Sequence, residues 1–431
     1  MAGVRLKWLK IEKYRNVAPG TELHFSNRFN VLLGKNGTGK TTLLRLLAMI
    51  VADELTPLAE SPLEFSYGLA LDVAHIDVEV KNEQREPAGG LGLPQFAWWY
   101  RVSFRPTLGS TSWEIRATQN GAELTQWANN KRNQKPLNLL PSPFIDRFLL
   151  ALFPWFEANT VPHDSDYEAL KSAWETVYEI DVARFDEGLG GFAALTEVSP
   201  NPAGKDLRPA GVTIAAEVSG KMLSGALNFA PFEIWTAIKS KDLNETISLG
   251  DSELSFLHKA IEAMSFKDAT MLMRRRKKTV DPQRDMQRVS YVGFEFNFTL
   301  PDGAVIRHED LSYGQKRLLS FLYYAAANPH IIIADELVNG LHYEWIETCL
   351  KEIQDRQSFL TSQNPVLVDL LPFESAEDVQ RSFILCSYEM HGDRGQMVWQ
   401  NMSAPKADAF YRAYETQALQ VSEILQTHGL W

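Results

Sequence analysis

GKNGTGKTT, at residues 34–42, is the stretch that decides the fold of this chain. It matches the pattern G-x-x-x-x-G-K-[ST] at every fixed position. Residues 28–33, which read as a strand, precede it, and residues 41–52 follow with leucines at helical spacing. Strand, glycine-rich turn and helix in this order form a phosphate-binding loop, because the turn points backbone N–H groups inward and the helix N-terminus favours an anion. The stretch predicts an α/β protein that binds a nucleotide.

Each polar residue of this loop has an expected task. Lys40 is expected to contact the β- and γ-phosphates of ATP, and the Thr41 hydroxyl is expected to bind Mg²⁺. A glycine-rich hairpin that binds nothing is the competing interpretation, and the flanking strand and helix disfavour it. The predicted nucleotide-binding set is Asn36, Gly37, Gly39, Lys40, Thr41 and Thr42.

A second stretch, IIIADE at 331–336, supplies the carboxylates that a phosphate-binding loop needs. Its apolar part reads as a buried strand that ends in two acids. Asp335 is expected to hold the Mg²⁺ ion, and Glu336 is expected to polarise the attacking water as the catalytic base. Surface acids after an apolar strand are common in α/β proteins, and it is the phosphate-binding loop that favours the functional interpretation.

The third motif, LSYGQ at 311–315, opens a predicted helix about 20 residues before Asp335. Here the sequence resembles the ABC ATPase superfamily, whose signature reads L-S-x-G-Q. The resemblance implies that Ser312 and Gly314, with Gln315 beside them, contact the γ-phosphate of an ATP held by the opposite subunit. It therefore implies a homodimer or a higher homo-oligomer with ATP at the interface. An ordinary serine N-cap is the alternative, and both interpretations can hold at once.

Residues 339–342, NGLH, resemble the D-loop of the RecF-, SMC- and OLD-like branch of these ATPases. The opening of the chain also looks like that of RecF-type heads, and this implies that Arg15 and Asn16 approach the nucleotide. A solvated turn is the alternative for these two residues. Where such heads carry a histidine in T-H-S-P, this chain has Gln363. A glutamine can hydrogen-bond a phosphate but carries no charge near neutral pH, so slow hydrolysis is predicted unless glutamine fills the same positioning task.

The predicted fold is an α/β ABC ATPase head with a mixed or parallel core sheet, an antiparallel β-subdomain and a helical insertion. Residues 1–139 are predicted to form lobe I, with the phosphate-binding loop and the antiparallel sheet. Residues 140–285 form the insertion, and 286–431 form lobe II. Helices are expected at 141–152, 166–182 and 251–263, and one closing helix at 408–428.

Composition sets further limits. The 431 residues carry a formal net charge of −11, and two cysteines exclude a disulfide framework. No apolar run reaches the ~20 residues of a membrane span, and no signal peptide is evident, so a reduced, cytoplasmic setting is expected. One basic cluster stands out, and it predicts nucleic-acid contact, a solvated helix end or a docking patch for an acidic partner. It consists of Arg274, Arg275, Arg276, Lys277 and Lys278.

Together these motifs predict an ATP-driven conformational switch. The resemblance extends to stand-alone heads that serve as ATPase subunits of phage-defence systems such as PARIS and Septu. It implies that the chain controls a separate effector protein, a nuclease, in antiviral defence. Two alternatives stay open at this point. One is a RecF-like DNA-repair ATPase that clamps DNA, and the other is a slowly hydrolysing scaffold that binds ATP to hold an assembly together.

Overall fold

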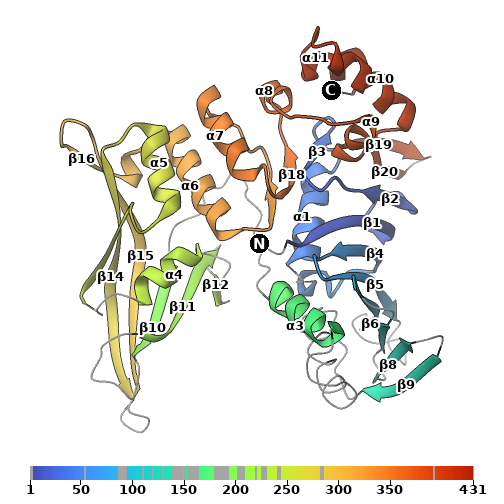
Figure 1. Cartoon of the computed structure of the whole chain (residues 1–431), viewed down its shortest axis with the longest axis horizontal. Coiled ribbons are helices and arrows are strands. Elements are labelled where there is room, and N and C mark those ends of the chain that lie inside the picture. The colour runs from blue at the N-terminus through green and yellow to red at the C-terminus, as the bar shows by residue number, and fades with distance from the viewer. Residues whose placement is uncertain are drawn as a thin grey trace. The chain divides into compact units, whose positions relative to one another are not determined.

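The computed structural model divides into two compact units. The P-loop unit comprises Met1–Val182 and Arg356–Trp431, and the signature unit comprises Ala183–Asp355 (Figure 1). The residues that the structure describes are 3–52, 55–85, 95–108, 111–118, 121–128, 131–137, 149, 152, 165–178, 194–200, 209–218, 221–224, 231–239, 244–281, 286–391 and 394–430.

A mixed sheet carries the phosphate-binding loop in the P-loop unit. Strand β3 (Phe29–Leu33) lies between β18 (Gln357–Thr361) and β19 (Phe383–His391), parallel to both, and β20 (Arg394–Asn401) pairs antiparallel with β19. All five residues of β3 are buried. Four are apolar, and the fifth, Asn30, donates its side-chain amide to the carbonyl oxygens of Ser26 and Ser358, each at 3.1 Å. Helix α1 (Lys40–Val51) follows the loop and buries its leucine face. The predicted strand, loop and helix are confirmed.

An antiparallel sheet forms the rest of this unit's strand structure, in the order β2-β1-β4-β5-β6-β7-β8-β9. Alternation of buried and less buried residues runs along its strands, as in β7, and explains the predicted antiparallel subdomain. The bounds are β1 Arg5–Tyr14, β2 Thr21–His24, β4 Leu63–Ala70, β5 Ala74–Arg85, β6 Gln95–Pro106, β7 Ser112–Thr118, β8 Gly121–Ala128 and β9 Lys131–Leu137.

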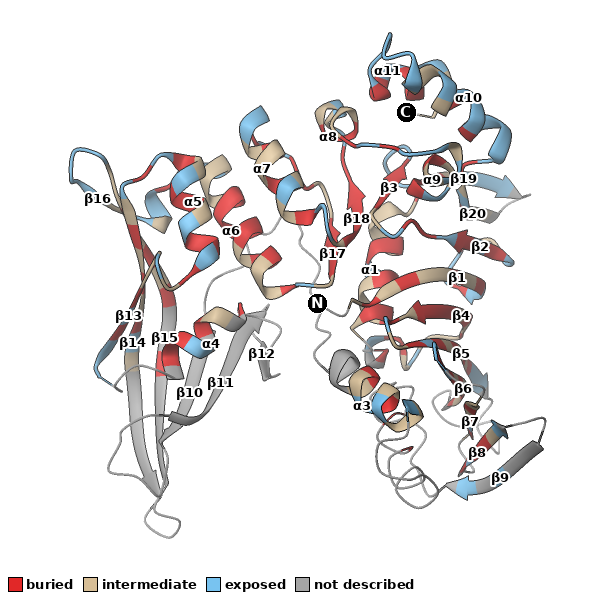
Figure 2. Ribbon diagram, viewed as in Figure 1, coloured by how far each residue is buried: buried red, intermediate tan, exposed pale blue. Residues whose placement is uncertain are grey.

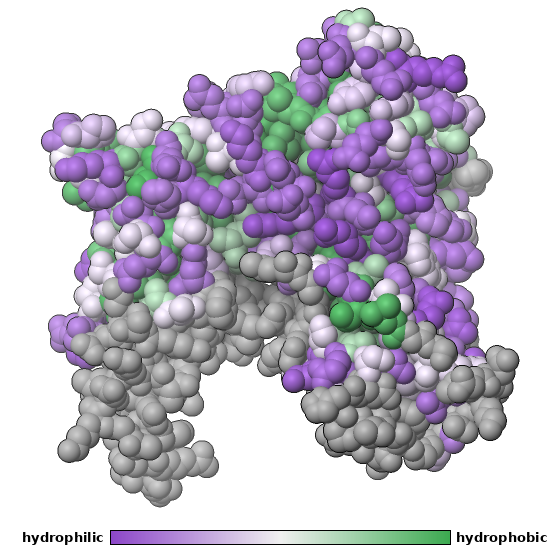
Figure 3. Space-filling view, in the orientation of Figure 1, coloured by the Kyte–Doolittle hydropathy of each residue, from purple (hydrophilic) through white to green (hydrophobic). Residues whose placement is uncertain are grey.

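The helices of the P-loop unit differ from prediction at the C-terminal end. The expected single helix at 408–428 is wrong, because the segment forms two helices. Gln417 adopts a left-handed conformation with φ 53, and Gln420 and Glu423 form a capping box that starts the next helix. Hydrophilic side chains prevail on the face of these two helices shown in Figure 3. The bounds are α3 Ser165–Tyr178, α8 Pro365–Asp369, α9 Ala376–Ser382, α10 Ala404–Glu415 and α11 Val421–Thr427, with the 3₁₀ turn η1 at Thr56–Leu58.

The signature unit contains a second antiparallel sheet, ordered β12-β11-β10-β15-β14-β13, with β16 paired to β15. Its bounds are β10 Ala194–Pro200, β11 Pro209–Val218, β12 Lys221–Ser224, β13 Thr246–Gly250, β14 Asp268–Asp281, β15 Met286–Thr299 and β16 Val305–Arg307. The other elements are α4 Phe232–Lys239, α5 Ser255–Met264, η2 His308–Asp310, α6 Tyr313–Ala327, β17 Ile331–Ala334 and α7 Tyr343–Ile353.

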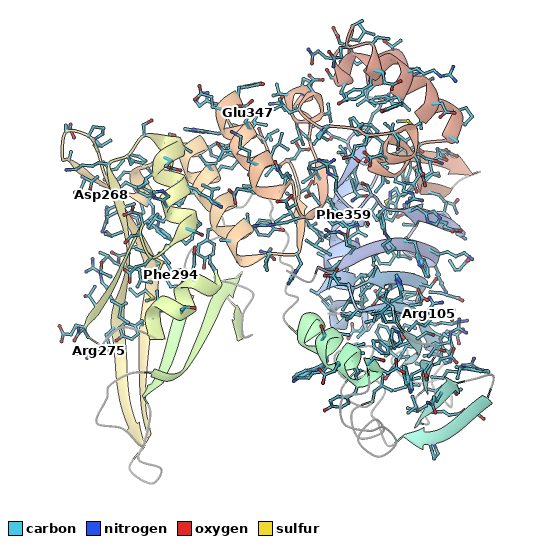
Figure 4. The ribbon with its side chains drawn as sticks, viewed as in Figure 1. Arg105, Asp268, Arg275, Phe294, Glu347 and Phe359 are labelled. Carbon is cyan, nitrogen blue, oxygen red and sulfur yellow. The ribbon has the colours of Figure 1, made fainter. Side chains whose placement is uncertain are left out.

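Aromatic side chains build the core of the signature unit. Phe256 of α5 meets Phe296 of β15 and Tyr323 of α6 edge-on, at centroid distances of 6.1 and 5.4 Å. Figure 2 shows buried residues gathered on α5, α6 and the sheet residues beside them. In Figure 4, Phe294 points from β15 into this core, and Arg275 extends outward from the sheet. These contacts fix α6, which carries the signature motif, on the sheet.

The segment 140–285 is mixed, and its helical prediction is incomplete. Helices α3, α4 and α5 are present, but five strands, β10 to β14, lie there as well. The basic cluster at 274–278 falls on β14, so the interpretation as a solvated helix end is wrong. The predicted helix at 141–152 lies outside the described residues, apart from Leu149 and Leu152. The sequence predicts three segments with boundaries at 139 and 285, whereas the structure divides into two compact units. The three-segment division stays a prediction.

No helix among the described residues is both long and apolar enough to cross a membrane.

Candidate functional site: a phosphate-binding loop and a signature helix

The phosphate-binding loop bends at glycines that no other residue could replace without strain. Gly34, Gly37 and Gly39 have φ angles of 146, 84 and 88°, in the region that residues with a Cβ avoid. The Lys40 Nζ donates to the carbonyl oxygens of Gly34 at 2.6 Å and Lys35 at 3.2 Å, so its ammonium lies inside the loop. Among the described residues no side chain caps α1 at Gly39. The first amides of this helix thus suit a bound anion.

Strand β20 packs against the phosphate-binding loop. The Trp399 indole Nε1 donates to the Thr38 carbonyl oxygen at 3.1 Å, and Trp399 itself is buried. A Cβ placed on Gly39 would lie 2.2 Å from the Met397 Sδ. A Cβ on Gly34 would lie 2.1 Å from the Cys386 carbonyl oxygen of the neighbouring β19. Local sequence could not place these residues beside the loop, because Trp399 and Thr38 are 361 positions apart and meet only through the pairing of the sheet.

The same strand holds the turn that contains Arg15 and Asn16. The Met397 backbone N–H donates to the Asn16 carbonyl oxygen at 2.8 Å, and the Asn16 side-chain amide donates to the Gly395 carbonyl oxygen at 3.5 Å. Arg15 adopts φ 49, is exposed, and places its guanidinium 5.4 Å from the Tyr14 ring centroid. One strand therefore anchors both the phosphate-binding loop and this turn, and contact of Arg15 and Asn16 with a nucleotide stays a prediction.

Gln363 emerges at the edge of the sheet that carries the loop. The parallel register of β18 and β3 places Thr361 opposite Leu32. Both strands end at one edge, so Gln363 and Gly34, each two residues further on, leave the sheet on the same side. Gln363 is exposed, and the Asn364 side chain caps α8 by accepting from the Val366 N–H at 3.0 Å. This placement suits a residue that faces bound phosphate.

In the signature unit, the two predicted acids follow the buried strand β17. Asp335 and Glu336 are partly exposed at its carboxyl end. Glu336 has φ 51, a left-handed conformation that is uncommon for a residue with a Cβ. The Tyr324 hydroxyl bonds both the N–H and the carbonyl oxygen of Ile333, at 2.8 and 3.1 Å, and so fixes β17 to α6. The acids thus project from a firmly held strand end.

The signature motif opens α6 with a complete capping box. The Ser312 hydroxyl accepts from the Gln315 N–H at 3.3 Å, and the Gln315 side chain accepts from the Ser312 N–H at 2.9 Å. The predicted serine N-cap is confirmed. A Cβ on Gly314 would lie 2.8 Å from the Gly340 carbonyl oxygen and 3.0 Å from the Trp345 ring. Glycine at 314 is therefore required by the close approach of the segment at 339–342.

The described part of the basic cluster is paired with carboxylates. Arg274 lies 3.0 Å from Glu295, and Arg275 lies 3.1 Å from Glu245. Arg276, Lys277 and Lys278 also lie on β14, but the structure does not describe their side chains. Exposed pairs of this kind contribute little to stability but offset local positive charge. Nucleic-acid contact through the cluster stays a prediction.

The site residues divide between the two units. The P-loop unit holds the loop at 34–42, the turn at 15–16 and Gln363. The signature unit holds the signature motif at 311–315 and the acids at 335–336. The hydroxyl and carboxylate oxygens of Thr41 and Asp335 are the hard donors that Mg²⁺ prefers. The glycine bends and the uncapped α1 N-terminus fit a polyphosphate.

The chain is similar to one protein family over part of its length and to solved structures at low identity. A family model described as an AAA domain matches residues 9–132. No sequence among curated proteins matches the chain. A solved structure of an SMC head bound to the C-winged helix domain of ScpA shares 12% identity at a TM-score of 0.35, over 92% of this chain and 98% of that one.

Two further solved structures are similar at the same distant level. The SMC head domain with a coiled coil and joint from Pyrococcus yayanosii shares 10% identity at a TM-score of 0.34, over 96% of this chain and 100% of that one. The recombination mediator RecF with ATP shares 13% identity at a TM-score of 0.24, over 84% and 94%. The match to the AAA domain family covers residues 9–132, which include the phosphate-binding loop at 34–42.

Proposed function

We propose that this protein is an ATPase that works as a nucleotide-gated switch. The observation that carries the proposal is the geometry of the loop at 34–42, where three glycines bend the backbone and the Lys40 ammonium lies among the loop carbonyls. A lysine in this position neutralises the β- and γ-phosphates of a nucleotide as a point charge. The AAA domain match over 9–132 supports the same activity.

The chain's own residues have distinct tasks in this reaction. The Thr41 hydroxyl and the Asp335 carboxylate would hold Mg²⁺, which neutralises phosphate charge when bound. The Glu336 carboxylate accepts a proton from the attacking water as general base. Gln363 offers a neutral amide that can orient a phosphate or a water by hydrogen bonding but does not take up a proton near neutral pH.

A dimer completes the proposed switch. Ser312 and Gly314 stand at the N-terminus of α6, where the helix dipole favours an anion. We propose that they contact the ATP bound by a second copy of the chain, so that ATP closes a homodimer and hydrolysis opens it. The signature resemblance and the exposure of Ser312 support this assembly.

Two substitutions test the proposal. Lys40→Ala removes the phosphate contact, and we expect the Kd for ATP, from calorimetric titration with Mg²⁺ present, to rise by about 100-fold. Glu336→Gln keeps the shape of the base without its proton affinity, so binding persists while phosphate release slows by about 10²- to 10⁴-fold. Lys351→Gln, an exposed change on α7, serves as the control. Wild-type rates in Glu336→Gln would exclude the proposed mechanism.

The role downstream of ATP is proposed on the motif resemblance alone. We propose that the ATP-bound dimer controls a separate effector, a nuclease, in antiviral defence. Cells that carry the chain with its neighbouring genes should resist phage, and Lys40→Ala and Glu336→Gln should each change that resistance. Equal plaque counts with and without the wild-type genes, across a diverse phage panel, would count against the defence role and leave the ATPase proposal standing.

A further inference from the structure

Arg317 is a charged residue that the proposed mechanism does not use, although it is completely buried. It lies on α6 with an exposed fraction of 0%. A buried guanidinium requires acceptors, because it carries five N–H donors that lose their contact with water. Here the acceptors belong to the backbone that follows β17, so the charge has a specific place to act.

Three consecutive carbonyl groups meet this one side chain. The Arg317 Nε donates to the Leu337 oxygen at 3.2 Å, and its Nη2 donates to the Asp335 oxygen at 3.5 Å and to the Glu336 oxygen. The planar fork of a guanidinium is suited to such convergent acceptors, whereas a lysine ammonium is not. Arg317 therefore grips the backbone of both predicted acids.

The gripped segment has an unusual conformation. Glu336 adopts φ 51, which residues with a Cβ reach only when their surroundings impose it. The Asn339 N–H donates to the Glu336 carbonyl oxygen at 3.2 Å and closes the turn behind it. The direction of the Glu336 side chain is set by this backbone bend, and the Arg317 contacts lie on the carbonyls at its centre.

Arg317 also ties the bend to the signature motif. It follows Ser312 by five positions on α6, whose N-terminus is closed by the capping box of Ser312 and Gln315. A helix transmits displacement as a rigid element over so short a distance. The residue that contacts ATP of the second subunit and the backbone that orients the base thus belong to one connected structure.

We propose that Arg317 is a positioning residue that holds the Glu336 carboxylate in its hydrolytic orientation and links it to the signature serine. The proposal rests on the proposed ATPase function and names a group with no direct contact to the nucleotide. It explains why a fully charged side chain is kept in the apolar interior of the unit, where an apolar residue would otherwise pack.

Arg317→Gln and Arg317→Lys test the proposal, with Lys351→Gln as the matched loss of a surface charge. We expect kcat to fall by about 100-fold in Arg317→Gln, because a base displaced by roughly 1 Å loses its alignment. The Kd for ATP should stay within about twofold of the wild type, since the interaction lost acts on the chemical step. Arg317→Lys should recover part of kcat, because one ammonium keeps the charge but not the fork.

A second readout follows the bend itself. Hydrogen exchange of the peptide at 335–341 should rise in Arg317→Gln and stay unchanged in Lys351→Gln, whether or not ATP is hydrolysed. Wild-type kcat in a folded Arg317→Gln protein, or unchanged exchange at 335–341, overturns the assignment. Loss of activity in Arg317→Gln only in proportion to a loss of ATP-binding sites would show a purely structural role and would also overturn it. Failure of the ATPase proposal is distinct, since Glu336→Gln would then match the wild type.

Discussion

Gln363 is the residue that we expect to influence the rate of ATP hydrolysis most directly after the proposed base, Glu336. It leaves the sheet at the same edge as the phosphate-binding loop, at the position where the ATPase heads that the sequence resembles carry a histidine. An amide orients a phosphate or a water by hydrogen bonding but cannot take up a proton near pH 7. We therefore expect the difference between the two side chains to affect the chemical step more than the binding of ATP.

We expect Gln363→His to raise kcat, by about tenfold as the contribution of a positioned titratable group at this site. The measurement is steady-state phosphate release at saturating ATP between pH 6 and 8. Gln363→Asn, which keeps an amide but shortens its reach, is the control and should not exceed the wild type. An unchanged or lower rate in Gln363→His would show that glutamine already does the positioning work.

Cys386 is a buried cysteine of β19, next to Gly34 of the phosphate-binding loop. Burial raises the pKa of its thiol to about 12, against an opposing effect of the Lys40 charge, and burial likewise raises the pKa of Cys349. The reactive thiolate is therefore scarce in the folded protein at pH 8. The folded pKa of Cys386 exceeds the unfolded value of 9.0. Its contribution to stability is thus complete below that value and is lost as pH rises from there towards 12.

We expect iodoacetamide to label Cys386 far more slowly in the native protein at pH 8 than in urea, as measured by mass spectrometry of its peptide. Labelling should accelerate above pH 9, because the native state then loses stability relative to the unfolded state. MgATP should slow it further, since a ligand that binds only the folded state stabilises that state. Equal native and denatured rates at pH 8 would contradict the buried environment of this thiol.

At the scale of elements, the loop and β20 form one structure although they are remote in sequence. Gly37 and Gly39 have nearly the same φ, 84 and 88°, but differ in their surroundings. A Cβ on Gly37 meets nothing within 4 Å, whereas one on Gly39 meets the Met397 Sδ at 2.2 Å and the Trp399 ring at 3.2 Å. Backbone strain and steric conflict can therefore be separated by two matched substitutions.

Gly37→Ala should lower the free energy of unfolding by about 1–2 kcal/mol, the cost of a left-handed conformation. Gly39→Ala should cost about 1–3 kcal/mol more, because β20 must move to admit the methyl group. Urea unfolding curves of both proteins provide the comparison, and Gly20→Ala, with φ 76 and no neighbour within 4 Å, supplies a control outside the loop. Equal midpoints for the two loop variants would show that β20 yields freely.

Strand β14 lies in a segment for which the sequence predicts helix. Ala269, Met271 and Met273 alternate and are buried, which is a strand pattern, but the basic run from Arg274 onward interrupts it. The sequence predicts helix across 140–285 because the charged side chains hide the alternation of buried and exposed residues. The strand β14 forms through its pairing with β15, which local sequence does not reveal. β14 is long because it pairs with β15 over most of its length, and local propensity does not predict this pairing.

At the scale of the whole molecule, we expect two copies of the chain to assemble through the N-terminus of α6 when ATP is bound. Ser312→Arg places a cation at the N-terminus of α6, where the helix dipole opposes it. In the proposed dimer the arginine would also fill the space of the phosphate bound by the second copy. We expect light scattering of Glu336→Gln with ATP to report a dimer, and the same protein with Ser312→Arg to stay a monomer. Hydrolysis should fall together with dimer formation in the otherwise wild-type chain.

Ser375→Arg is the matched control for this experiment. Ser375 also caps a helix through its hydroxyl, accepting from the Asp378 N–H at 3.1 Å, and it is exposed at the start of α9. The same substitution should cost a similar ~1 kcal/mol of helix capping without affecting assembly. A dimer that forms equally well with Ser312→Arg would exclude the ATP sandwich.

Local residue types are enough to predict the chemistry of the candidate site and the strands and helices that flank its motifs. The loop at 34–42, the strand before the acids and the Ser312 cap follow from local residue types, because glycine, serine and apolar runs act through their own backbone. Tertiary structure alone decided what supports that chemistry. Trp399 beneath the loop and Arg317 behind Glu336 gain their roles from packing and buried hydrogen bonds, which depend on partners that adjacent sequence does not specify.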